Sequence, residues 1–182
     1  LIILDAPAGH AISFLRSPTG VAEAATSGAL HTQATEALAM LGDPSRARVM
    51  LVTLPEETPI NELVETAFSL EEEVGVMLGP VILNGTWPPL PGLDTPLAEA
   101  ARRASVDLSA EERVSLASAG AYRTERSELQ QELTERLATE LPLPHLDLDF
   151  VFTNELESDD LRTLADDLLR GIEALDPNWA AL

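Results

Sequence analysis

Residues 49–84 read VMLVTLPEETPINELVETAFSLEEEVGVMLGPVILN, and this stretch decides the fold class. Its opening run, Val49 to Leu54, is rich in Val and Leu, which is typical of a strand buried on both faces. Thr58 and Pro59 make a good helix start, because Thr can cap free amides and Pro suits the first helical position. A second apolar run, Met77 to Leu83, predicts another buried strand, and Gly79-Pro80 within it leaves a later start open. Strand, helix and strand in this order predict an α/β fold with a mostly parallel sheet flanked by helices.

The same alternation extends along the chain. Leu1 to Asp5 is a continuous apolar run that predicts a further buried strand, and Leu146 to Phe152 predicts a short fourth one. Helix-like stretches lie between and after these runs: His10 to about Leu15, Leu30 to Leu41, 58 to 74, Ser109 to about Glu140, and Ser158 to Ala174. Because domains seldom begin in the middle of their sheet, we expect a single domain over 1–182 that is incomplete at its N-terminus. A helical segment is expected at about 94–140.

Two helices carry local signals for their ends and their buried faces. Ser109 and Glu112 have the spacing of a capping box, in which each residue satisfies the other's backbone. In the helix they open, one apolar stripe is expected from Leu129, Leu133 and Leu137. Ser158 and the two acids after it are expected to cap the last helix, since acids suit the positive end of the helix dipole.

Composition excludes several classes of protein. The 182 residues carry 31 acidic and 11 basic side chains, a net charge of -20, which disfavours nucleic acid and anionic membrane surfaces as partners. The chain has no Cys, which excludes disulfides, zinc ribbons and thiol catalysis. All the basic residues are Arg, so a phosphate-binding loop ending in Gly-Lys-Ser/Thr is absent from these residues. No apolar run reaches the length of a membrane span, and no secretory signal pattern is seen, so a cytoplasmic protein is expected.

Polar residues follow three of the expected strands. Asp5 comes at the end of the first run, Glu56 shortly after the second and Asn84 after the third. Ligands of open parallel sheets bind outside the carboxyl ends of the strands, so these residues form a candidate site. There a carboxylate such as Asp5 can hold Mg²⁺ through water, and Gly9 lets the backbone approach a phosphate. A plainer alternative is open for each residue: Asp5 can equally serve only to cap the following helix, and the segments of Glu56 and Asn84, taken singly, are the better match to structural turns.

In their order, these segments resemble one ATPase family. Asp5-Ala-Pro-Ala-Gly9-His10 looks like the switch segment of the arsenite-pump-driving (ArsA-type) ATPases, which include the factor that targets tail-anchored membrane proteins. The stretch 49–62 is similar to that family's next strand and helix start, and Val81 to Asn84 to its adenine-side strand. The likeness runs along nearly the whole chain and is strongest to a bacterial subgroup of paired subunits. It implies a P-loop NTPase-like fold whose first strand and phosphate-binding loop are absent here.

The resemblance also implies roles for single residues. Asp5 would hold the water shell of Mg²⁺, and Gly9 would lie against the γ-phosphate as part of the switch. Asn84 would contact adenine, Glu56 would lie near the nucleotide at a dimer interface, and Phe152 would belong to the turn that closes over the base. The sequence departs from the family at Ala8, where the family has Thr, and in the turn at 150–153, which lacks the usual Pro.

Three functions follow as hypotheses. The first is an ATP-binding and ATP-hydrolysing protein that couples a dimer switch, in a homodimer or a paired heterodimer, to a client or transported substrate. Under this hypothesis the chain alone does not hydrolyse ATP, because the phosphate-binding loop is absent from these residues. The second is a non-catalytic scaffold subunit that pairs with an active ATPase. The third is a relative of the cell-division or partitioning ATPases, which the acidic last helix disfavours. The helix from Glu111 to Leu137 could line a groove for a hydrophobic client, although an ordinary core helix is the better expectation.

Overall fold

The computed structural model describes residues 1–176 and residue 179; the rest of the expected domain 1–182 lies outside the described residues. It is an α/β structure with a three-stranded parallel sheet in the order β1-β2-β3. Six α-helices and one π-helix lie in the described part of the chain. The elements are α1 (Ala8–Ala24), α2 (Ala29–Leu41), β1 (Val52–Thr53), α3 (Glu57–Ser69), η1 (Leu70–Val74), β2 (Val81–Thr86), α4 (Leu97–Ala104), α5 (Ala110–Glu140), β3 (His145–Asp149) and α6 (Ser158–Ala174).

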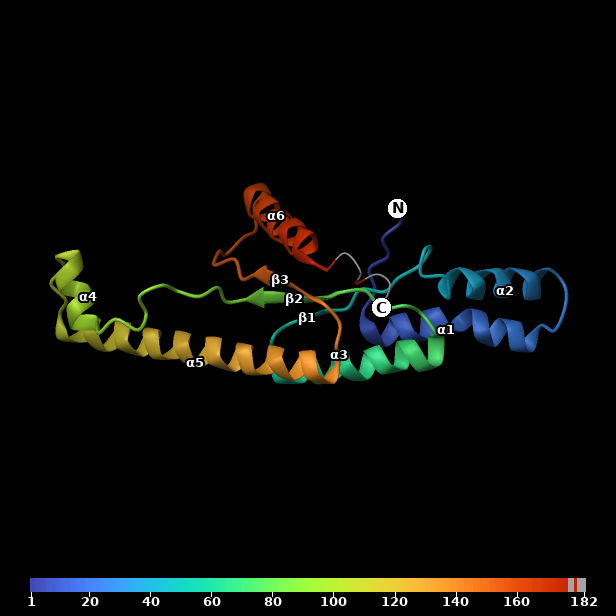
Figure 1. The fold of residues 1–182 in the computed structure, drawn as a ribbon, viewed down its shortest axis with the longest axis horizontal. Helices are drawn as coiled ribbons and strands as arrows, with labels where there is room; N and C mark the ends of the chain where they lie inside the picture. The colour runs from blue at the N-terminus through green and yellow to red at the C-terminus, as the bar shows by residue number, and fades with distance from the viewer. Residues whose placement is uncertain (177–178, 180–182) are drawn as a thin grey trace.

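The helices cover the two faces of the sheet unequally. Helices α3 and α5 run along one face, and α6 packs on the other face against β3 (Figure 1). The paired helices α1 and α2 extend from one end of the sheet, and α4 with the start of α5 extends from the other (Figure 1). Among the helices of the described residues, α3 is the one that packs on β1.

The hydrophobic core fills the space between the sheet and the α3–α5 layer. Its fully buried members come from α3, η1, β2 and α5: Ile60, Ala67, Leu70, Val81, Leu83 and Leu137. Alternate residues of β2 point into this core, because successive side chains of a strand face opposite sides of the sheet. The alternating strand and helix pattern of residues 49–84 thus gives the predicted fold class.

The predicted capping box of α5 is confirmed. Ser109 Oγ accepts the backbone N–H of Glu112 at 3.3 Å, and the Glu112 carboxylate accepts the backbone N–H of Ser109 at 2.8 Å. The helix ends at Glu140, as expected. Its buried stripe, however, consists of Gln130, Leu133 and Leu137.

Other expected boundaries are wrong. The run Leu1 to Asp5 is not a strand: residues 1–7 form neither helix nor strand and are exposed, because no neighbouring strand offers them hydrogen bonds. The helix expected at His10 to Leu15 is longer and already begins at Ala8, which places Gly9 inside its first turn. The strand expected at Val49 to Leu54 is shorter in the structure and consists of β1 alone. Before β1, Val49 forms a single parallel backbone pairing with Leu78.

The remaining corrections concern strand and helix ends. β2 begins at Val81, after Gly79-Pro80, and β3 ends at Asp149 and not at Phe152. Thr58 does not cap α3; Glu56 occupies the cap position and makes no side-chain capping bond. For α6 the cap is Glu157, one residue before the expected Ser158, and it forms a capping box with Asp160.

The buried stripe of α5 gives a stability prediction. Leu137→Ala is expected to lower the free energy of unfolding by about 2–5 kcal/mol, because it opens a cavity in the core. Leu129→Ala, on the same helix but 44% exposed, is the matched control and is expected to cost well under half as much. Urea unfolding followed by circular dichroism measures both, and equal losses would contradict this packing of α5.

Candidate functional site

Two pockets adjoin the carboxyl ends of β1 and β2. The first, which we call the edge pocket, has a volume of about 280 Å³ and ten lining residues: Ala8, Leu51, Val52, Thr53, Leu54, Pro59, Glu62, Leu63, Thr66 and Asn84. The second, which we call the aromatic pocket, has a volume of about 270 Å³ and eight: Leu54, Pro55, Glu56, Gly85, Trp87, Tyr122, Arg126 and Phe150. Leu54 lines both pockets, so they meet at the end of β1.

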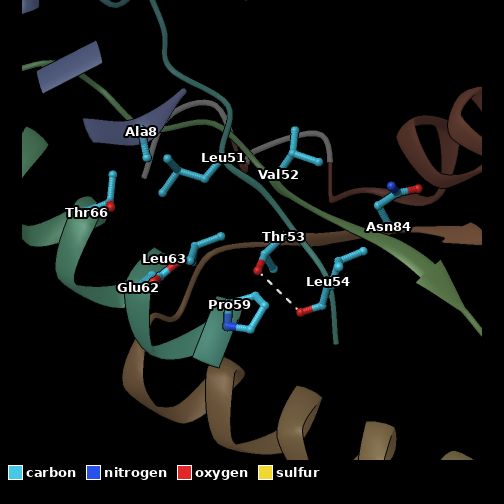
Figure 2. Close-up of a pocket in the computed structure, with 10 residues that line it drawn as sticks. All are labelled: Ala8, Leu51, Val52, Thr53, Leu54, Pro59, Glu62, Leu63, Thr66 and Asn84. Atoms are coloured by element: carbon cyan, nitrogen blue, oxygen red, sulfur yellow. Dashed lines mark hydrogen bonds between the residues drawn. The ribbon is translucent and has the colours of Figure 1, made fainter. Parts of the chain in front are cut away.

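The edge pocket wraps around the outer edge of the sheet. Thr53 points toward α3, where Pro59, Glu62 and Leu63 lie (Figure 2). Asn84 lies on β2, on the other side of the β1 segment from α3 (Figure 2). Ala8, at the start of α1, closes the far end (Figure 2). The polar groups that line it are hydroxyls, an amide and one carboxylate, and no Arg is among the lining residues.

The aromatic pocket lies against the richest aromatic cluster of the described residues. Trp87, from the loop after β2, packs edge to face on Tyr122 of α5 with centroids 5.8 Å apart and on Phe152 at 5.4 Å. Phe150 lies 4.7 Å from Phe152 and completes the cluster. The chain has only four Phe, two Trp and one Tyr, so more than half of its aromatic residues gather here.

Two arginines of α5 accompany these rings. The guanidinium of Arg123 lies over Trp87 at 4.7 Å and over Phe152 at 5.2 Å, and it donates to the carbonyl of Pro88 at 2.5 Å. Its Nε is buried and has no hydrogen-bond partner among the described residues. Arg126 forms a half-buried ion pair with Glu56 at 2.6 Å, which joins α5 to the loop between β1 and α3.

The buried amide of Gln130 fixes α5 beside the end of β2. Its Oε1 accepts the backbone N–H of Trp87 at 2.9 Å, and its Nε2 donates to the carbonyl of Gly85 at 3.4 Å. Both ends of the side chain are therefore used, as burial of an amide requires. These two hydrogen bonds hold Trp87 next to the face of α5 that carries Tyr122 and Arg126.

The structure distributes the residues expected from the sequence over both pockets. Asn84 lines the edge pocket, Glu56 lines the aromatic pocket, and Phe152 packs on Trp87 beside it. Asp5 and Gly9 line neither pocket, although their neighbour Ala8 does. A side chain at Gly9 would meet nothing within 4 Å, so contacts within the described chain do not require this glycine.

Four residues of the aromatic pocket and its cluster were not predicted from the sequence: Trp87, Tyr122, Arg123 and Arg126. A signal was available on α5, because residues 122, 126 and 130 follow one another at four-residue spacing and so share one helix face. No signal linked that face to Trp87, which lies in a loop 35 residues before Tyr122 in the sequence.

Chemically, the aromatic pocket offers rings to a planar group, and the lining of the edge pocket offers no positive charge to an anion. Aromatic faces suit a planar ring, and a buried amide and an ion pair frame the aromatic pocket. Phosphoryl groups need positive charge, and none lines the edge pocket. Among residues 1–176 and 179 there is also no group of three acidic or His side chains that could hold a metal ion.

No family model matches the chain, and a search of curated proteins finds no match. In the part of the chain that the structure describes, no helix combines the length and the apolar character needed to cross a bilayer.

Two groups whose pKa is shifted by burial, His145 and Asp147, lie on β3, and neither lines a pocket. Burial lowers the pKa of His145, and the Asp147 carboxylate offsets this only in part. Burial likewise raises the pKa of Asp147, against the opposing effect of His145. Within the part of the chain that the structure describes, the buried Nε2 of His145 has no hydrogen-bond partner. These groups therefore affect stability and do not mark the candidate site.

This shift gives a prediction for the pH dependence of stability. In the unfolded chain His145 takes up a proton near its ordinary pKa of about 6.5, whereas the folded chain does so only at lower pH. The unfolded state thus binds more protons in this window, and stability falls as the pH drops from about 8 to about 6. His145→Asn is expected to reduce this fall, as measured by urea unfolding across the pH range. His10→Asn, in the exposed segment at the start of α1, is the control, and equal slopes in wild type and His145→Asn would contradict the burial of His145.

Proposed function

We propose that this chain supplies the base-binding side of an ATP site, and that it belongs to an ArsA-like ATPase whose phosphate-binding loop lies outside these residues. The observation that carries the proposal is the junction of the two pockets at Leu54, outside the carboxyl ends of parallel strands. That is where open α/β sheets bind nucleotides. The resemblance of residues 5–10, 49–62 and 81–84 to that family supports the same conclusion.

In this proposal the aromatic pocket binds the base. The edge pocket extends from it to Ala8, within the segment 5–10 that resembles the family's switch. Trp87, Tyr122 and Phe150 line the aromatic pocket, and stacking of a base on an aromatic ring contributes about 1–3 kcal/mol per base. Asn84 lies one residue from Gly85 and presents both a donor and an acceptor. Mg²⁺ would supply charge neutralisation for the phosphates, and the expected protein ligand on this chain is Asp5 through water. Since no cation lines the edge pocket, we expect no ATP turnover by this chain.

The non-catalytic scaffold subunit is the second candidate. It is favoured by the same lack of positive charge and by Ala8 at the position where the resembling family has Thr. A scaffold of this kind needs the fold and a partner ATPase but no nucleotide. The first proposal also includes dimerisation, a client protein and a cytoplasmic location.

Ligand titration separates the two candidates. Trp179→Phe leaves Trp87 as the single Trp of the chain, so its emission reports directly on the aromatic pocket. Adenosine is expected to change this emission on binding, and Mg·ATP is expected to bind no more tightly, because the phosphates meet no cation on a chain of net charge -20. Added salt should strengthen ATP binding and leave adenosine binding unchanged.

Variants locate the bound ring. In this background Tyr122→Ala is expected to weaken adenosine binding roughly tenfold through lost stacking, and Asn84→Ala to weaken it through lost hydrogen bonds. Asp5→Asn should leave adenosine binding unchanged. Phe14→Ala, an exposed aromatic residue on α1 that lines neither pocket, is the control. A folded protein that binds neither adenosine nor ATP would contradict the nucleotide proposal and would favour the scaffold subunit.

A further inference from the structure

The aromatic pocket has one acidic and one basic side chain among its eight lining residues, Glu56 and Arg126. The other six are aromatic, aliphatic, Pro or Gly. In a pocket of this kind the rings supply most of the contact area, and a few placed polar groups fix the orientation and the identity of the ligand. Because hydrogen bonds to charged groups are the strong ones, the charged pair is the part of the pocket best able to select a ligand.

The pair presents hydrogen-bond donors and an acceptor side by side. Arg126 Nη2 donates to Glu56 Oε1 at 2.6 Å, which uses one N–H group of the guanidinium and one oxygen of the carboxylate. A guanidinium carries five N–H groups and a carboxylate has two oxygens. The ion pair therefore keeps further donors on Arg126 and a second acceptor oxygen on Glu56, next to each other at the wall of the pocket.

Backbone hydrogen bonds hold both members of the pair in place. The N–H of Glu56 donates to the Leu54 carbonyl at 2.8 Å, and its carbonyl accepts the N–H of Ile60, a fully buried residue, at 3.1 Å. Arg126 lies one turn before Gln130, whose two hydrogen bonds fix α5 beside the end of β2. Groups that distinguish similar small ligands need this kind of support from the surrounding structure.

The 6-amino group of adenine, together with a neighbouring ring nitrogen, is complementary to this pair. The amine donates a hydrogen bond and the ring nitrogen accepts one. In a 6-oxopurine such as hypoxanthine, a carbonyl oxygen replaces the amine, so two acceptors face each other at Glu56. Stacking on the rings makes no such distinction, because every base has a π-face. Selection between these bases therefore depends on the charged pair.

We propose that Glu56 and Arg126 determine the base specificity of the aromatic pocket. The Glu56 carboxylate accepts a hydrogen bond from the 6-amino group of adenine, and the Arg126 guanidinium donates one to the adjacent ring nitrogen. The inference rests on the proposed function, in which this pocket binds the base. It adds the two side chains that distinguish a 6-aminopurine from a 6-oxopurine.

The experiment titrates three nucleosides into the Trp179→Phe chain and follows the emission of Trp87. Adenosine carries the 6-amino group, purine riboside has only hydrogen at that position, and inosine has a carbonyl there. Purine riboside is expected to bind roughly tenfold more weakly than adenosine, because the Glu56 carboxylate loses its donor. Inosine is expected to bind more weakly still, because its carbonyl oxygen faces the carboxylate.

Variants in the same background assign the two hydrogen bonds. Glu56→Gln is expected to weaken adenosine binding roughly tenfold and to leave purine riboside binding unchanged, because only adenosine has the amine. Arg126→Met is expected to weaken the binding of both nucleosides alike, since both keep the ring nitrogen. Glu57→Gln removes the same charge at the next residue, which is exposed and lines neither pocket, and is the matched control. Circular dichroism checks that each variant is folded.

The possible outcomes separate this inference from the proposed function. If the folded chain binds neither adenosine nor purine riboside, the pocket binds no base and both are overturned. If the three nucleosides bind with equal affinity, the base site stands, but the charged pair does not select the base and the inference is wrong. A Glu56→Gln chain that loses affinity for adenosine and purine riboside alike would show a structural role for Glu56 and would also overturn the inference.

Discussion

The buried amide of Gln130 is the interaction on which the arrangement of the candidate site depends. An amide without partners is costly to bury, and this one is satisfied only because the loop after β2 presents the Trp87 N–H and the Gly85 carbonyl to it. The packing of Leu133 and Leu137 holds α5 on the sheet face, but apolar contacts alone permit it to slide or rotate. The two hydrogen bonds of Gln130 fix the register of the helix, and so decide which α5 residues stand at the strand ends.

From that register the neighbouring interactions follow. One turn before Gln130 lies Arg126, which reaches Glu56 across the end of β1, and a further turn back lies Tyr122, which meets the edge of Trp87. The Arg126–Glu56 pair is only partly shielded from water, so its free-energy contribution is small, in the range of about 0–1 kcal/mol for exposed pairs. Its importance is geometric, since it sets the position of the β1–α3 loop that borders both pockets.

Much of the fold could be predicted from the sequence, because its signals are local. The strand–helix–strand pattern of residues 49–84 and the capping box at Ser109 depend on neighbours within a few residues, and both were confirmed. The strand predicted at Leu1 to Asp5 was wrong for the opposite reason. An apolar run shows only that a segment can be buried, whereas a strand forms only where another strand supplies its hydrogen bonds. For the site, the sequence predicted that polar groups would gather at strand ends. It could not predict the aromatic cluster, because Trp87, Tyr122 and Phe150 meet only through tertiary packing.

The distribution of charge separates the two halves of the site. The chain places Arg123 and Arg126 beside aromatic rings, where a guanidinium stacks well and retains its hydrogen bonds, and places none at the edge pocket. A pocket lined by Glu62 and hydroxyls at the edge of a molecule of net charge -20 repels a polyphosphate instead of attracting it. A base and a triphosphate are joined covalently, so under the proposed function this chain gains affinity for a whole nucleotide only when positive charge arrives from elsewhere.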